Sequence, residues 1–239
     1  MALKAKMIDV TKCTGCRACQ VACKQWNQLP AQIEAFTGSL QTHTRVLHNT
    51  WTFVKFIERT NAGVFEWLFR KHQCMHCQDA TCISVCPRGA FTRSDVGSVI
   101  RDLSRCKGCG DCQDNCPYDA ADTRPLEPQY AYSCKFCWDR VGNGLTPACS
   151  KACTTGAIQF GDRTAIIDAA NARKNELLTQ YPEANVYGIN EMHGTLVIYV
   201  LPYAPSIYGL TSGQQNSHTG GYDWSGYWTG DPCLNPNGY

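Results

Sequence analysis

Sixteen of the 17 cysteines in this 239-residue chain fall into four groups of four with a repeated spacing. Each group begins C-x-x-C and ends C-x-x-x-C, and only the middle interval varies, from two residues to four to eleven. Because such a repeat fixes the same side chains at four places along the chain, it constrains the fold more than any other feature. The quartets are Cys13, Cys16, Cys19 and Cys23; Cys74, Cys77, Cys82 and Cys86; Cys106, Cys109, Cys112 and Cys116; and Cys134, Cys137, Cys149 and Cys153.

The spacing within the quartets predicts iron–sulfur ligation. Cysteines this close in sequence seldom form disulfides with each other, and the chain is much longer than the small secreted domains in which disulfides are dense. A Cys₄ zinc site needs only two C-x-x-C pairs, so zinc leaves the third and fourth cysteine of each group unexplained. A cubane cluster takes three cysteines from one loop and a fourth from elsewhere. We therefore expect four [4Fe–4S] clusters, with all sixteen cysteines as iron ligands.

The last cysteine of each quartet is expected to ligate another cluster, as in bacterial two-cluster ferredoxins, where proline usually follows it. Proline follows Cys86 and Cys116 but neither Cys23 nor Cys153. The second and third quartets are close in sequence, so we pair them into Cys74, Cys77, Cys82 and Cys116 (cluster C) and Cys86, Cys106, Cys109 and Cys112 (cluster D). Elimination, together with a resemblance given below, pairs the other two into Cys13, Cys16, Cys19 and Cys153 (cluster A) and Cys23, Cys134, Cys137 and Cys149 (cluster B).

The charge balance excludes a nucleic-acid partner and changes once clusters are counted. Lys and Arg number 22 against 20 Asp and Glu, a formal net charge of +2, and no basic run appears. An oxidised cluster with four thiolates carries about −2, so four clusters bring the protein to about −6. Basic residues beside the quartets either offset this charge or are ordinary solvated side chains: Lys12, Arg17, Lys24, Arg105, Lys107, Lys135, Arg140 and Lys151.

The segments around the quartets predict an α+β fold of tandem bacterial ferredoxin-like [4Fe–4S] modules with a β-hairpin insert and a C-terminal extension. Aromatic and β-branched runs at 51–57 and 64–69 flank Asn61-Ala-Gly63, which predicts the hairpin. Apolar residues at helical spacing predict a helix over 164–180. The expected domains are residues 1–23 with 125–163 (quartets one and four), 24–73 (the insert), 74–124 (quartets two and three), and 164–239 (helix, a strand at 194–201 and an extended tail).

The remaining features argue against a catalyst. No nucleophile–base pair, phosphate loop or dinucleotide motif appears.

We expect no signal peptide in residues 1–9 and no transmembrane segment, since the longest apolar run, 196–201, is far short of the ~20 residues that a bilayer requires. Cys233 is expected to be a free tail thiol, and the histidines to lie in the core or at the surface. Four aromatic residues suggest that the tail either docks onto a partner or folds back: Tyr222, Trp224, Tyr227 and Trp228.

The order of the quartets, with the long interval inside the fourth, resembles the iron–sulfur β subunit of molybdenum- or tungsten-bispterin oxidoreductases. Within that family the segments 13–30, 146–158 and 193–210 are similar to β subunits of formate dehydrogenases. The resemblance implies a separate Mo/W-bispterin catalytic subunit that oxidises formate, and four clusters that pass its electrons to a cytochrome or other acceptor. It also implies that the module of quartets one and four faces the catalytic subunit.

Two departures from the family matter. Membrane-bound members carry a C-terminal transmembrane helix where this chain has a polar, aromatic tail, so we expect a soluble or loosely attached complex. Some members lack one cysteine of the third quartet, whereas Cys109 is present here, so all four sites should hold four irons. We expect a periplasmic location by co-export with the catalytic subunit, with the cytoplasm as the alternative. Other functions left open are a complex acting on polysulfide, thiosulfate, a sulfoxide or nitrate, and a free polyferredoxin shuttle.

Overall fold

The computed structural model describes residues 2–31, 35–36, 38–41, 44–123 and 130–210. The expectations for the tail aromatics, for Cys233 and for His43 lie outside these residues. All sixteen quartet cysteines lie within them.

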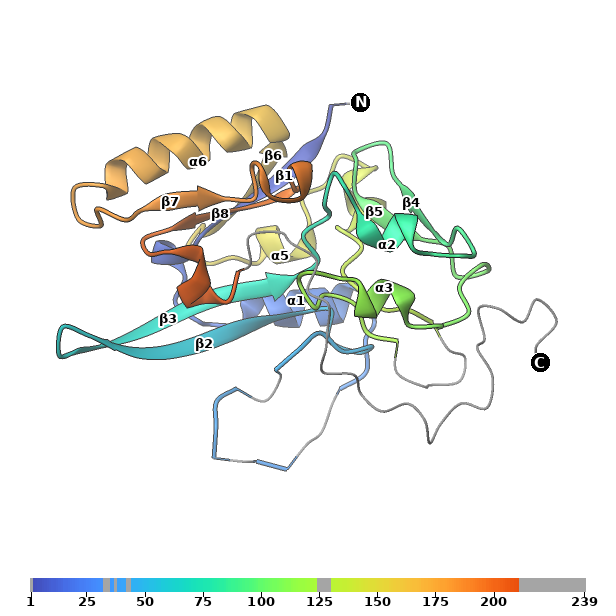
Figure 1. Ribbon diagram of the computed structural model, residues 1–239, viewed down its shortest axis with the longest axis horizontal. Helices are drawn as coiled ribbons and strands as arrows, with labels where there is room; N and C mark the ends of the chain where they lie inside the picture. Colours follow the sequence, from blue (N-terminus) through green and yellow to red (C-terminus); the bar gives the residue numbers. More distant parts are fainter. Residues whose placement is uncertain (1, 32–34, 37, 42–43, 124–129, 211–239) are drawn as a thin grey trace.

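A four-stranded sheet joins the two ends of the described chain. Its strand order is β6-β1-β8-β7, formed by Ile158–Asp162, Lys4–Asp9, Val197–Leu201 and Asn185–Tyr187. The pair β1–β8 is parallel, whereas β1–β6 and β7–β8 are antiparallel. Since β1 precedes the first quartet and β6 follows the fourth, their pairing brings these two distant quartets to the same side of the molecule (Figure 1).

Helix α6 (Arg163–Leu177) covers one face of this sheet, and the cysteine-bearing loops lie on the other side (Figure 1). All five residues of β8 are buried, as expected of a central strand covered on both faces. Ile198 and Val200 pack with Ile166 and Ala170 of α6. Alternate residues of β8 belong to the core that contains Cys19 and Cys149, because successive side chains of a strand point to opposite faces.

Strands β2 (Thr52–Asn61) and β3 (Val64–Gln73) form a long antiparallel hairpin. Asn61 pairs with Val64, which leaves a two-residue turn in which Ala62 and Gly63 both have positive φ, as a type I′ hairpin turn requires. The turn end is exposed and the opposite end is buried (Figure 1), and Tyr203 donates a hydrogen bond of 2.6 Å to Glu66 nearer the turn. Cys74 follows directly after β3.

The second and third quartets surround a smaller unit. Strands β4 (Phe91–Arg93) and β5 (Val99–Arg101) are antiparallel, and the short helices α2 (Thr81–Ser84) and α3 (Asp111–Asp114) carry cysteines. The core of this unit consists largely of cysteines and alanines, so little of its interior is filled by large apolar side chains. The remaining elements are α1 (Ala18–Trp26), α4 (Trp138–Val141), α5 (Ala148–Lys151) and the 3₁₀ helices η1 (Val10–Lys12), η2 (Glu191–His193) and η3 (Pro205–Tyr208).

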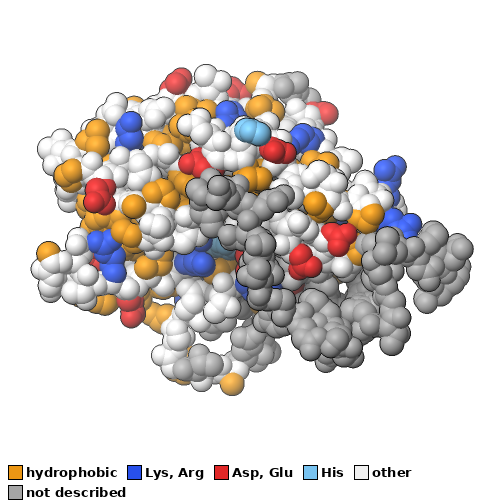
Figure 2. All heavy atoms as spheres, viewed as in Figure 1, with side chains coloured by type: hydrophobic (Ala, Val, Ile, Leu, Met, Phe, Trp, Pro, Cys, Tyr) orange, Lys and Arg blue, Asp and Glu red, His pale blue; other side chains and the backbone are white. Residues whose placement is uncertain are grey.

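The described surface is mixed in character. On the face shown in Figure 2, basic, acidic and hydrophobic side chains are interspersed, in keeping with the formal net charge of +2. Among the described residues, no helix combines the length and the apolar character needed to cross a membrane. Together with the helices and strands above, these observations describe a mixed α+β protein built around cysteine-bearing loops.

A substitution at Gly188 tests how closely the surrounding atoms of the sheet pack against this position. Its φ is +104°, and a Cβ would lie 2.5 Å from the carbonyl oxygen of Val197 and 2.7 Å from Thr195 Oγ1. We expect Gly188→Ala to lower the free energy of unfolding by at least about 2 kcal/mol, since backbone strain and overpacking add. Gly144→Ala is the control, because Gly144 also has positive φ but has no heavy atom near its added Cβ within 4 Å. Denaturant unfolding followed by circular dichroism measures both, and equal losses would contradict the role of crowding.

Candidate metal centres

Cys13, Cys16, Cys19 and Cys153 line one cavity. The first three come from the loop after η1 and from the start of α1, whereas Cys153 follows α5, near the far end of the cysteine-bearing chain. These four are the residues expected for cluster A. Ile8, Val54 and Ala157 supply apolar walls. The cavity therefore presents four thiols between apolar walls and two basic side chains, Arg17 and Lys71, which is a donor set suited to an iron–sulfur cluster.

A buried carboxylate holds the loop that carries Cys13. Asp9 is 0% exposed and accepts hydrogen bonds from the backbone N–H and the hydroxyl of Thr11, at 3.0 and 2.6 Å. It thereby caps η1, whose last residue precedes Cys13. Arg173 of α6 donates through Nε to the other oxygen of Asp9 at 2.8 Å. The helix on the far side of the sheet thus helps to position the first quartet.

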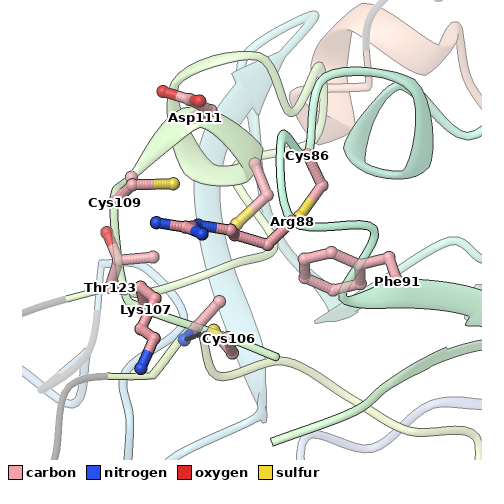
Figure 3. A pocket seen from close by; sticks show the side chains of 12 residues that line it. Cys86, Arg88, Phe91, Cys106, Lys107, Cys109, Asp111 and Thr123 are labelled. Carbon is pink, nitrogen blue, oxygen red and sulfur yellow. Dashed lines mark hydrogen bonds between the residues drawn. The ribbon is translucent and has the colours of Figure 1, made fainter. Parts of the chain in front are cut away.

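A second cavity is lined by Cys86, Cys106, Cys109 and Cys112. Figure 3 shows that Cys86 comes from one loop while Cys106 and Cys109 come from another. These four are the residues expected for cluster D. Arg88, Phe91, Lys107 and Thr123 also line this cavity, so basic side chains lie beside the thiols (Figure 3).

The other eight cysteines also lie in two neighbourhoods. Burial, then the charges of nearby Cys116 and Cys82, raise the pKa of the Cys77 thiol, and burial with Cys116 raises the pKa of Cys82 to about 12. Burial and the nearby Cys134, Cys149 and Cys137 raise the pKa of the Cys23 thiol well above its usual range. Thiols this close together resist ionisation until a cation joins them, and iron binding releases their protons. The proximities correspond to the expected ligand sets of clusters C and B.

Backbone N–H groups point at several of the sulfurs. Ala90 and Ala120 donate to the cysteines four residues before them, Cys86 and Cys116, at 3.4 and 3.5 Å. Three more such bonds run from Ala131 to Cys106, from Phe136 to Cys134 and from His76 to Cys74. Hydrogen bonds to sulfur stabilise the electron-rich form of an iron–sulfur cluster and raise its potential.

One of the sixteen cysteines reaches the surface. Cys16 is exposed, whereas the other fifteen are buried or half-buried. No three His, Cys, Asp or Glu side chains of the described residues converge closely enough to hold a single metal ion. The cysteine side chains are arranged around open spaces and do not converge on a single point. A multi-iron core needs this arrangement.

Comparison with known proteins agrees with this geometry. Two families, both described as a 4Fe-4S dicluster domain, match residues 12–90 and 65–163. The formate dehydrogenase-O iron-sulfur subunit of Escherichia coli is 40% identical over 229 residues, covering 94% of this chain and 76% of the relative. The nitrate-inducible formate dehydrogenase iron-sulfur subunit of the same species is 39% identical, covering 85% and 70%. Formate dehydrogenase 2 subunit beta (cytochrome c-553) of Nitratidesulfovibrio vulgaris is 34% identical, covering 83% and 93%.

The chain belongs to the family of formate dehydrogenase iron–sulfur subunits. It is an electron-transfer subunit that holds [4Fe–4S] clusters in tandem dicluster domains. This assignment supersedes the zinc alternative.

The sequence did not reveal the basic residues that lie deepest in the subunit. Among the eight cations named beside the quartets, Arg140 alone is buried. Lys6 and Lys71, which were not singled out, are 1% and 2% exposed. A signal was present for Lys6, because it stands inside the apolar strand β1 between Ala5 and Met7. Lys71 lies near the end of β3, three residues before Cys74.

We predict that the ion pair between Asp9 and Arg173 stabilises the subunit. Arg173→Met leaves the buried Asp9 carboxylate without its closest ion partner, so we expect a loss of about 3 kcal/mol in the free energy of unfolding. Glu176→Gln is the matched control, because Arg173 also pairs with the exposed Glu176 at 2.8 Å and exposed pairs contribute about 1 kcal/mol or less. Denaturant unfolding of both variants gives the comparison. Similar losses would show that Asp9 does not depend on Arg173.

Proposed function

We propose that this subunit carries four [4Fe–4S] clusters and passes electrons from a Mo/W-pterin formate dehydrogenase catalytic subunit to a cytochrome or other acceptor. The observation that carries the proposal is the composition of the two cavities. In each, three cysteines of one quartet meet the last cysteine of another quartet. This exchange is the ligand pattern of two-cluster ferredoxins, and it supports the sets named above as clusters A to D.

The proposed architecture follows from the same exchange. Residues 1–23 with 125–163 form one ferredoxin module, 74–124 form the other, 24–73 are an insert with the hairpin, and 164–239 extend the C-terminus. The pairing of β1 with β6 supports the first module, because it joins the segments that flank its outer cysteines. The pairing of β4 with β5 supports the second module differently, because these strands lie between its two quartets and bring Cys86 and Cys106 to the same cavity.

When bound, the clusters supply one-electron redox chemistry. The chain's own residues bury the sulfurs, donate backbone hydrogen bonds to them and exclude most solvent, which together set the potentials. The exposure of Cys16 supports electron entry at cluster A, where a catalytic subunit could approach closely.

The partners are proposed from the relatives. Several relatives are named as formate dehydrogenase subunits, and one name includes cytochrome c-553. For this chain we propose a catalytic subunit that acts on formate and a periplasmic location reached by co-export with it. Cell fractionation together with pull-down of the native complex tests both. A partner acting on nitrate or a sulfur compound would replace formate as the substrate.

Metal analysis of the native protein tests the number of clusters. We expect about sixteen irons and sixteen acid-labile sulfides per chain after purification without air, because four cubanes contain that many.

Adding formate to the complex with its catalytic subunit should bleach the visible absorption. At least two clusters should have low potentials, and a titration that places all four above the range of plant-type ferredoxins, about −400 mV, would contradict formate as the donor.

Iron content in double variants tests the ligand sets. Cys13→Ala and Cys153→Ala should each remove or shrink cluster A, so the double variant should lose no more than the four irons of that one cluster. Cys13→Ala with Cys137→Ala should instead lose the sum of two single losses, because two different clusters are affected. An additive loss in the Cys13→Ala, Cys153→Ala double variant would instead show that each quartet holds its own cluster.

A further inference from the structure

Two lysine ammonium groups share one amide oxygen inside the protein. Lys6 Nζ donates to Gln73 Oε1 at 3.3 Å, and Lys71 Nζ donates to the same oxygen and to Thr52 Oγ1, the latter at 2.6 Å. An ammonium group can only donate, so the amide oxygen of Gln73, and not its nitrogen, must face both lysines. The Gln73 side-chain nitrogen has no hydrogen-bond partner among the described residues.

This arrangement lacks the anion that buried lysines normally require. Both lysines are at most 2% exposed, and within the described part of the chain neither forms an ion pair with a carboxylate. Two like charges held this close in a low-dielectric interior repel each other and lose their hydration. A permanent negative charge beside them would offset both costs.

The nearest candidates for that charge are the cysteine thiolates. Lys6 Nζ lies 3.9 Å from Cys149 Sγ and 4.6 Å from the centre of the Phe136 ring, which stands between Cys134 and Cys137 in the chain. These contacts place the Lys6 ammonium group directly beside the cysteines proposed for cluster B.

Lys71 occupies the matching place beside the other site of the module. It lines the cavity together with the four cysteines proposed for cluster A. Tyr199, on β8, donates a hydrogen bond of 2.6 Å to the backbone carbonyl of Lys71 and so fixes this part of β3. The Lys6–Gln73–Lys71 bridge thus spans from one site to the next.

We propose that the Lys6–Gln73–Lys71 bridge is a fixed positive charge between clusters A and B that raises the reduction potentials of both. The inference rests on the proposed ligand sets. Reduction of a cluster adds one electron and one negative charge, with no proton required, so a buried cation at short range favours the reduced form. Because one bridge serves both sites, it also eases the repulsion that arises when an electron occupies each of them.

The test compares variants that all lower the net charge by one. Lys6→Met and Lys71→Met remove one ammonium each, and Gln73→Glu keeps both lysines and their acceptor but adds a carboxylate between them. Lys4→Met is the matched control, since Lys4 lies on the same strand with an exposed side chain that pairs with Asp162 at 2.6 Å. Iron content and EPR-monitored redox titration of the full chain are the readouts, so no catalytic activity is needed.

In each of the three interior variants we expect the equilibrium constant for one-electron reduction of two clusters to fall at least tenfold, which is about 59 mV. The other two clusters, and all clusters of Lys4→Met, should keep their potentials. If a lysine variant loses its iron, Gln73→Glu decides by the same criterion, because it removes neither lysine.

The outcomes separate the inference from the function on which it rests. A wild-type chain without four clusters overturns both. Four clusters whose potentials stay unchanged in Gln73→Glu overturn the bridge and leave the electron-transfer role intact. A shift in Lys4→Met as large as those of the interior variants also overturns it, because the effect would then follow from net charge alone.

Discussion

The rest of the structure depends on one constraint. Cysteines from loops that are distant in sequence must come together around a shared space. The cavity of Cys13, Cys16, Cys19 and Cys153 joins the first quartet to the fourth. The pairing of β1 with β6 holds those ends together, and β8 and α6 bury the strands that do so. The C-terminal elements therefore act as the support of the N-terminal quartet, and the Asp9–Arg173 bond is where that support reaches the loop itself.

The same constraint explains why the interior has an unusual composition. Thiols gathered without metal are held protonated by burial and by one another, as the raised pKa values of Cys77, Cys82 and Cys23 indicate. Such a core gains little from apolar packing, particularly around the second and third quartets. Metal–thiolate bonds add cohesion to such a core, because metal binding that needs a preformed site is coupled to folding.

The sequence predicted the cysteine chemistry better than it predicted what surrounds it. Spacing alone indicated clusters, and the hairpin and the helix after the fourth quartet were visible as aromatic runs and as helical periodicity. The strands β2 and β3 extend beyond the apolar runs, because their outer residues keep the ladder while pointing into solvent. Lys6 and Lys71 could not be assigned, because whether a lysine in a strand is buried depends on segments that pack across it from elsewhere in the chain.

The exposure of Cys16 has a consequence for where oxidative damage to the protein begins. An electron crosses between proteins most readily where a redox centre comes near the surface, and the loop of Cys16 offers such an edge. Dioxygen and peroxide reach the same edge, since they are small and need no docking. The site proposed for electron entry is thus also the one most accessible to oxidants. Damage to the subunit should begin at the site of Cys16 and spread inward, and a partner seated over this loop would act as a shield as well as a donor.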